Sequence, residues 1–172
     1  MTVSAPDIKI VIPVRLQSSR LPKKVLQDIS GKSMLEWVWL RAVQSDMGQV
    51  IIAVDEQEVL DLAESFGAEV CMTQSTHLSG TDRCYEVAET MDWSDETRIV
   101  NLQADEPLMP SVCLQQIAAL SMSYDIAACS LFEWIDDDSV FHDPNVVKVL
   151  CDHDDGALYF SRAALPYRRE SD

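Results

Sequence analysis

Short apolar runs alternate along the chain with segments whose apolar residues recur at helical spacing. The β-branched run 9–14 predicts a buried strand, and 49–54 predicts a second strand of the same kind. Between them, apolar residues at helical spacing over 34–42 predict a helix. Ser33 and Glu36, three residues apart at its start, form the pattern of a capping box. The first 54 residues therefore predict a strand, a helix and a second strand.

The same alternation continues through the rest of the chain. Helices are expected over 59–66 (ended by Gly67), 81–91 and 110–122. Further strands are expected over 68–72, 98–102, 126–131, 146–150 and 157–160. Strands that alternate with helices indicate an α/β fold, a mostly parallel sheet covered by helices on both faces. Residues 1–7 are expected to form a flexible tail and residues 8–172 one domain.

Charge is distributed unevenly along this acidic chain. The net charge of −16 comes from 29 acidic and 13 basic residues, which argues against nucleic-acid binding. Six of the 13 basic residues nevertheless fall between positions 9 and 32, where Asp28 is the sole acid. These six are Lys9, Arg15, Arg20, Lys23, Lys24 and Lys32. A basic island on an acidic protein is a candidate site for a small polyanion.

No apolar run is long enough to cross a bilayer, and the N-terminus lacks the pattern of a signal peptide. We therefore expect a cytoplasmic protein with no membrane insertion.

The polar segment 15–24 follows the first expected strand directly. Its arginines, lysines, two serines and backbone amides suit a triphosphate, although a solvated basic loop has the same composition. The scattered glycines form neither a Walker loop nor a Gly-x-Gly-x-x-Gly motif. A nucleotide at this loop would therefore be held by another arrangement.

Two further polar segments lie where ligands of parallel sheets bind or at a helix start. Segment 101–107 follows a strand, and its Asp105 is the better candidate for Mg²⁺, although paired surface carboxylates are common. Segment 78–83 places Ser79 and Gly80 at a helix N-terminus, which is electropositive, or alternatively forms an ordinary capping turn. Each segment alone is weak evidence for a ligand-binding site.

Taken together, these segments resemble the Kdo cytidylyltransferases (CMP-Kdo synthetases), which activate 3-deoxy-manno-octulosonate (Kdo). The resemblance extends from about residue 8 to residue 166 and is carried by several motifs in register. These are Ile-Pro-Val-Arg at 12–15, Ser-Arg-Leu-Pro at 19–22 with Lys24, Ser-Gly-Thr-Asp-Arg at 79–83, Gln-x-Asp-Glu-Pro at 103–107, and segments 145–149 and 157–162.

The resemblance implies a three-layer, Rossmann-like nucleotide-diphospho-sugar transferase fold with a mostly parallel mixed sheet. It also implies a Mg²⁺-dependent transfer of CMP from CTP to Kdo, an acidic 3-deoxy sugar, with release of pyrophosphate. Arg15, Arg20 and Lys24 would neutralise the triphosphate, Asp105 would ligate Mg²⁺, and Gln103 and Arg162 would face the sugar. The full set expected to bind CTP is Pro13, Val14, Arg15, Ser19, Arg20, Lys24, Ser79, Gly80, Thr81 and Arg83.

Three departures from the family pattern qualify this interpretation. Lys23 and Ala104 stand where the family usually has glycine, and Ala104 could demand a backbone angle that alanine dislikes. Family members also continue past position 172 through a segment with a second metal-binding carboxylate, sugar contacts and much of a homodimer contact. Activation of a related acid sugar (8-amino-Kdo, capsule Kdo or a sialate), a truncated non-catalytic nucleotide-binding homologue and an incomplete copy of the enzyme are the alternatives.

Overall fold

The computed structural model describes residues 7–16, 23–123, 126–167 and 169, and they fall into two compact units. Unit 1 is Met1–Cys129 and unit 2 is Ser130–Asp172. Unit 1 contains β1 (Ile8–Pro13), η1 (Lys24–Leu26), β2 (Asp28–Ile29), β3 (Lys32–Ser33), α1 (Met34–Gln44), β4 (Gln49–Val54), α2 (Gln57–Ser65), β5 (Glu69–Met72), α3 (Gly80–Thr90), β6 (Arg98–Asn101) and α4 (Ser111–Ser123). Unit 2 contains α5 (Asp138–His142), β7 (Lys148–Cys151) and β8 (Ala157–Ser161).

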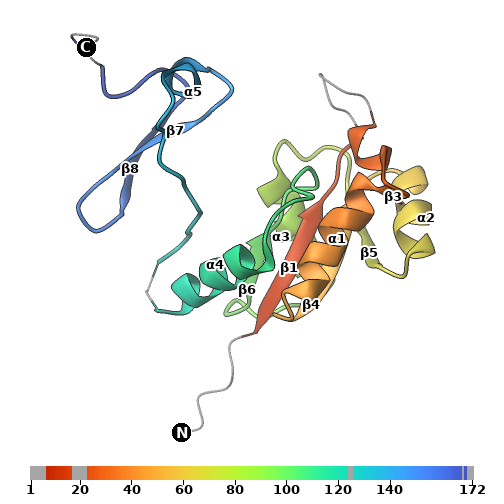
Figure 1. Cartoon of the computed structure of the whole chain (residues 1–172). Helices are drawn as coiled ribbons and strands as arrows, with labels where there is room; N and C mark the ends of the chain where they lie inside the picture. Colours follow the sequence, from red (N-terminus) through yellow and green to blue (C-terminus); the bar gives the residue numbers. More distant parts are fainter. Residues whose placement is uncertain (1–6, 17–22, 124–125, 168, 170–172) are drawn as a thin grey trace, which may run out of the picture. The chain divides into compact units, whose positions relative to one another are not determined.

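A parallel sheet of four strands forms the centre of unit 1, in the order β5-β4-β1-β6 (Figure 1). Strand β1 lies between β4 and β6, with Ile10 in register with Val50 on one side and Val100 on the other. The chain therefore first builds the sheet in one direction, from β1 through β4 to β5, and then returns to the other side of β1 for β6. This arrangement confirms the parallel α/β fold that the sequence predicted.

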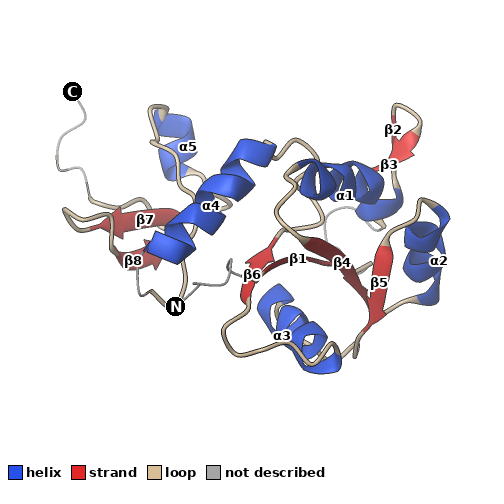
Figure 2. Cartoon of the chain, turned by 90° about the horizontal axis from the view of Figure 1, so that it is seen from below, coloured by secondary structure: helices blue, strands red, loops and turns tan. Residues whose placement is uncertain are grey.

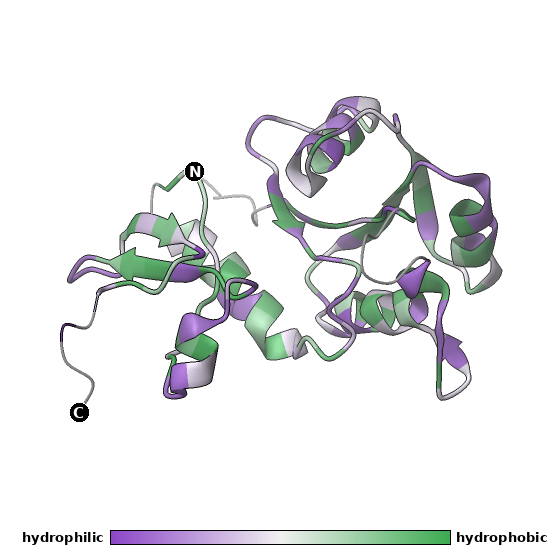
Figure 3. Cartoon of the chain, turned by 90° about the horizontal axis from the view of Figure 1, so that it is seen from above, coloured by the Kyte–Doolittle hydropathy of each residue, from purple (hydrophilic) through white to green (hydrophobic). Residues whose placement is uncertain are grey.

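Each face of the sheet packs against its own helices. Successive side chains of a strand point to opposite faces, so Ile10 and Ile12 pack with α1, α2 and α4 while Val11 packs with α3. Figure 2 shows α1 and α3 on opposite sides of the sheet, and Figure 3 shows mostly apolar colouring along its strands. The buried α3 residues of the second layer include Cys84, whose burial raises its thiol pKa to about 12, so it stays neutral.

Local sequence signals explain the start of α1 and the end of α2. Ser33 accepts a hydrogen bond from the Glu36 amide at the start of α1, as predicted, but the Glu36 side chain pairs with Lys32. The predicted capping box is therefore only half formed there. Helix α2 ends at Ser65, and Gly67 follows two residues later. The φ of Gly67 is 85°, in the left-handed region that glycine adopts without strain.

The prediction of a strand over 126–131 is wrong, because no described residue of that segment is in a strand. Its apolar residues indicated burial, but a strand also requires a partner backbone with which to pair. The segment instead contacts the preceding helix, where the Cys129 thiol lies 3.7 Å from the Ile117 carbonyl.

Unit 2 consists of α5 and the antiparallel hairpin of β7 and β8. The two strands were predicted, whereas the short helix α5 was not. Asp137 caps this helix by accepting a hydrogen bond from the Ser139 amide at 2.7 Å, and Phe141 is buried. In the hairpin turn, Asp152 accepts bonds from the amides of Asp154 and Gly156.

Within the described ranges, no helix combines the length and the apolar character required to cross a membrane.

Candidate functional site

The carboxyl ends of β1 and β6 form the place where a ligand of this sheet is expected. The two strands are neighbours in the parallel sheet, and ligands of such sheets bind beyond the carboxyl ends of the strands. The loop 14–16 leaves β1 here, and the segment 102–107 leaves β6. Two of the predicted functional segments are therefore adjacent in space.

Gly80, the first residue of α3, brings the third segment to the same place. A Cβ atom at this position would lie 3.1 Å from Cγ of Pro13 and 3.5 Å from Nε2 of Gln103. The helix start thus packs tightly between the residue that ends β1 and the residue that follows β6. A larger residue would push these segments apart, so this position requires glycine for close approach rather than for its backbone angle.

The N-terminus of α3 is closed by a complete capping box. Ser79 accepts a hydrogen bond from the Asp82 amide at 3.1 Å, and the Asp82 side chain accepts one from the Ser79 amide at 2.9 Å. The hydrogen bonds from the Ser79 hydroxyl and amide lower the pKa of the Asp82 carboxyl, so it remains ionised. The amides of Gly80 and Thr81 belong to the first helical turn, which has no intrahelical acceptors for them.

Arg15 links the β1 loop to the segment that precedes α3. Its guanidinium donates to the Leu78 carbonyl at 3.1 Å and to the His77 carbonyl. These bonds hold the cation beside the helix N-terminus, in a half-buried position. The predicted site residues Ser19 and Arg20 lie outside the described residues.

Lys24 and Asp105 approach each other at the carboxyl ends of β1 and β6. The Lys24 ammonium forms an ion pair with the Asp105 carboxylate, and their side chains are 30% and 45% exposed. The basic segment after β1 and the carboxylate after β6 are therefore within reach of the same ligand. The described residues include no group of three or more His, Cys, Asp or Glu side chains arranged to hold a metal ion.

The two residues that replace family glycines occupy different conformations. Lys23 has φ 54° and ψ 30°, the left-handed conformation that explains why glycine suits this position. Its side chain forms an ion pair with Glu58 at 2.5 Å. Ala104 is not among the described residues with positive φ, and its methyl group is buried in the core beside Leu102. The strained angle considered for Ala104 is therefore absent from the structure.

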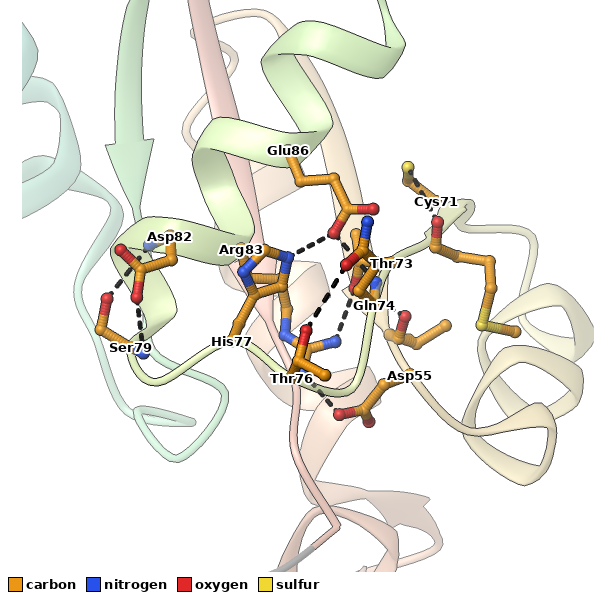
Figure 4. A network of polar contacts seen from close by, with 12 residues as sticks. Asp55, Cys71, Thr73, Gln74, Thr76, His77, Ser79, Asp82, Arg83 and Glu86 are labelled. Carbon is orange, nitrogen blue, oxygen red and sulfur yellow. Dashed lines mark hydrogen bonds and ion pairs between the residues drawn. The ribbon is translucent and has the colours of Figure 1, made fainter.

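Arg83 lies beneath the site rather than at its surface. The side chain is fully buried, and its guanidinium donates to Thr73 Oγ1 at 2.6 Å and to the Asp55 carboxylate at 2.5 Å (Figure 4). Thr73 in turn donates to the Val54 carbonyl. Arg83 thus ties α3 to the carboxyl ends of β4 and β5, so its side chain supports the site from inside the fold.

The two predicted sugar-binding residues belong to different units. In unit 1, Gln103 donates to the Asn101 side chain at 2.9 Å. In unit 2, the exposed Arg162 follows β8 and donates to the carbonyls of Pro144 and Asn145 at 3.0 and 3.3 Å. Each residue is held in place within its own unit.

Sequence reasoning missed Glu86 on α3. Its carboxylate accepts hydrogen bonds from the Gln74 amide at 2.9 Å and from the His77 ring (Figure 4). Partial burial alone would raise the pKa of this carboxyl, but the two hydrogen bonds and the charges of His77 and Arg83 outweigh it and lower the pKa. The available signal was the helical spacing of Asp82 and Glu86, which places both on one side of α3.

The fold is a parallel α/β sheet whose loops converge at the carboxyl ends of β1 and β6. The family model for cytidylyltransferases matches residues 9–172, and the chain belongs to that family.

The similar proteins support this assignment. The chain is 48% identical over 161 residues to the 3-deoxy-manno-octulosonate cytidylyltransferase of Haemophilus influenzae, covering 94% of the chain and 63% of that protein. It is 47% identical to the protein of that name from Actinobacillus succinogenes, covering 94% and 62%. The chain therefore spans slightly under two thirds of the length of these relatives.

Among solved structures, a CMP:2-keto-3-deoxy-manno-octonic acid synthetase complexed with CTP matches with a TM-score of 0.79 at 35% identity. That match covers 95% of the chain and 67% of the other protein. A cytidylyltransferase from Leptospira borgpetersenii matches with a TM-score of 0.61 at 23% identity, covering 70% and 51%, and shares the fold.

Proposed function

We propose that the chain carries the nucleotide-binding part of an enzyme that transfers CMP from CTP to Kdo, giving CMP-Kdo and pyrophosphate for lipopolysaccharide biosynthesis. The observation that carries this proposal is the close approach of Gly80 to Pro13 and Gln103 at the carboxyl ends of β1 and β6. Three motifs far apart in the sequence meet there, at the edge where such sheets bind ligands. The names of the relatives supply the identity of both substrates.

CTP would lie beyond the carboxyl ends of β1 and β6. The backbone at Pro13 and Val14 and the start of α3 from Ser79 to Thr81 would contact the cytidine. Arg15 and Lys24 would neutralise the triphosphate, since guanidinium and ammonium groups both bind phosphate oxygens. Ser19 and Arg20, which the structure does not describe, stay predicted members of the same loop.

Asp105 would hold Mg²⁺. Its carboxylate follows β6, is 45% exposed and already contacts a cation, the Lys24 ammonium. Mg²⁺ usually takes one or two carboxylates and completes its coordination with phosphate oxygens and water, so a single protein ligand at this position fits. The metal ion would draw negative charge from the phosphates when bound.

Gln103 and Arg162 would recognise the acid sugar. An arginine suits the sugar carboxylate because its planar guanidinium binds both oxygens. In the reaction, the anomeric oxygen of Kdo forms a bond to the α-phosphorus while the bond from that phosphorus to the bridging oxygen of pyrophosphate breaks. The hydroxyl proton leaves in the same overall step. Positioning and charge stabilisation supply most of the catalysis of such transfers.

Pyrophosphate release from CTP, Mg²⁺ and Kdo tests this proposal. The assay compares this chain with a version extended by the C-terminal segment of a relative, where the family implies homodimer contacts. Turnover by the extended version is expected. CTP binding without turnover by either version would favour a non-catalytic nucleotide-binding protein, and absence of CTP binding would reject the proposal. Retained Mg²⁺-dependent activity in Asp105→Ala would overturn the metal assignment.

A further inference from the structure

The segment 73–78, between β5 and α3, supplies the two carbonyl groups that hold Arg15. The acceptors are the backbone oxygens of His77 and Leu78. Because these contacts use the backbone, the position of the guanidinium depends on the path of this segment rather than on its side chains. Leu78 illustrates this, since its side chain is 91% exposed and packs against nothing that would fix its carbonyl.

Both ends of the segment are fixed by contacts of their own. At the start, the amide and hydroxyl of Thr73 both donate to the Val54 carbonyl, and Thr73 accepts a bond from Arg83. At the end, the capping box of Ser79 and Asp82 closes α3 without help from the segment. Only the middle of the segment remains to be accounted for.

Glu86 holds that middle part. One carboxylate oxygen accepts hydrogen bonds from both the Gln74 amide and the His77 ring. Figure 4 shows Glu86 and His77 pointing toward one another, with Glu86 reaching from α3 across to the segment. The side chains of His77 and Glu86 are only 18% and 22% exposed, so water competes weakly for these bonds. The helix thereby fixes the residue whose carbonyl contacts Arg15.

We propose that Glu86 is a positioning residue for triphosphate binding, which it serves by holding Gln74 and His77 and so fixing the carbonyls that orient Arg15. The inference rests on the proposed function, in which Arg15 neutralises the triphosphate of CTP. Glu86 itself does not touch the nucleotide. A pre-oriented guanidinium loses less conformational freedom when a phosphate binds, which is the physical origin of the gain in affinity.

A positioning role of Glu86 and a general role in the fold predict different effects on nucleotide binding. Arg15 would act on the phosphates, whereas the start of α3 would contact the cytidine. That helix start is stabilised by its own capping box and does not depend on Glu86. Loss of the Glu86 contacts should therefore weaken binding of CTP and leave binding of CMP, which lacks the β- and γ-phosphates, largely intact. A structural defect would weaken binding of both nucleotides.

Calorimetric titration of the chain with CTP and with CMP in Mg²⁺ tests the proposal. Glu86→Ala is expected to weaken CTP binding about tenfold and to change CMP binding by less than about twofold. Glu86→Gln keeps the volume and one acceptor oxygen, so its loss should be about threefold. Glu89→Ala removes an exposed carboxylate from the same helix and should leave CTP binding unchanged.

A double variant tests whether Glu86 acts through Arg15. If it does, Glu86→Ala has no further effect on CTP binding when Arg15→Ala is already present. Additive losses, equal weakening of CTP and CMP, or unchanged CTP binding in both Glu86 variants would each overturn the positioning role. Failure of the unsubstituted chain to bind CTP would instead reject the proposed function together with this inference.

Discussion

Among the described residues, each of the two units buries one cationic side chain, and the two are held in different ways. In unit 1, Arg83 is 0% exposed and forms an ion pair with Asp55. In unit 2, Lys148 is 4% exposed and donates to three backbone carbonyls, those of Asp143, Val146 and Arg162, at 2.7, 2.8 and 2.9 Å. The first cation is held by a carboxylate, and the second by three backbone carbonyls.

The surroundings of the two cations differ as well. Arg83 lies against a sheet whose two faces each have a buried apolar layer. Among the described residues of unit 2, Phe141 and Lys148 alone are buried, while Leu158, Tyr159 and Phe160 in β8 are 58–68% exposed. Unit 1 therefore offers a rigid scaffold for a ligand. Unit 2 depends on local hydrogen bonds to hold Arg162, whose carbonyl is one of the three acceptors of Lys148.

Replacing Arg83 should produce the largest loss of stability. Arg83→Met leaves the Asp55 carboxylate, which is 12% exposed, without its partner. Removing one member of a buried ion pair typically costs about 3–5 kcal/mol. The free energy of unfolding, measured by denaturant titration, should fall by about that amount.

The double variant Asp55→Asn with Arg83→Met serves as the control, because it also removes the unpaired carboxylate charge of Asp55. It should be more stable than Arg83→Met alone. A single variant as stable as the original chain would show that the buried pair does not stabilise unit 1, and the contrast with Lys148 would lose its basis.

Replacing Arg15 should give the next largest effect, on binding and not on stability. Loss of a charge-assisted contact to phosphate typically costs about 2–3 kcal/mol, so Arg15→Ala should weaken CTP binding roughly 30- to 100-fold. Equilibrium titration with CTP measures this change. Arg98→Ala removes the same charge from the amino end of β6 and should leave CTP binding unchanged. Equal losses in the two variants would show that net charge, rather than the position of Arg15, attracts the nucleotide.

Replacing Lys148 should have a smaller effect, confined to unit 2. Lys148→Met leaves three carbonyls without their donor, which should lower the local stability of the β7–β8 hairpin by about 1–3 kcal/mol. Hydrogen exchange of the amides of β7 and β8, which pair in the hairpin, reports this change. CTP binding should not change, and Lys32→Met, which breaks an ion pair in unit 1, should leave exchange in the hairpin unaltered. Weaker CTP binding in Lys148→Met would show that the two units depend on each other.

The sequence predicted the scaffold of unit 1 better than the contacts that support its site. The apolar run 49–54 gave β4 with its observed bounds, because a buried parallel strand has an unmistakable local pattern. The meeting of the segments that follow β1 and β6 also followed from general rules, since ligands collect at the carboxyl ends of parallel strands. Gly80 was predicted at this site from its motif, but its close packing against Pro13 and Gln103 was not.

The supporting contacts depend on residues that are distant in sequence. Arg83 has the local pattern of an arginine in the first turn of a helix, and nothing nearby reveals that it is buried against Asp55, 28 positions earlier. Glu86 likewise has the pattern of a surface carboxylate until the segment 73–78 is placed against it. In unit 2, α5 was missed because a five-residue helix has too few apolar positions to show a period.

The pH dependence of stability should give the smallest effect and tests Glu86 directly. The pKa of its carboxyl is lowered in the folded chain from the ordinary value of 4.5, so folding favours the ionised form. A lowered pKa contributes stability above the pKa of the unfolded chain, and that contribution is lost as the pH falls through the folded pKa. Melting temperatures of the original chain and of Glu86→Gln should therefore differ most at neutral pH and converge below about pH 4, because the original chain then loses its charge. Glu89→Gln, on the exposed side of α3, should show no such convergence. A difference between the chain and Glu86→Gln that stays constant down to pH 3 would mean that the Glu86 charge does not hold the segment 73–78, and the carbonyls around Arg15 would then require another support.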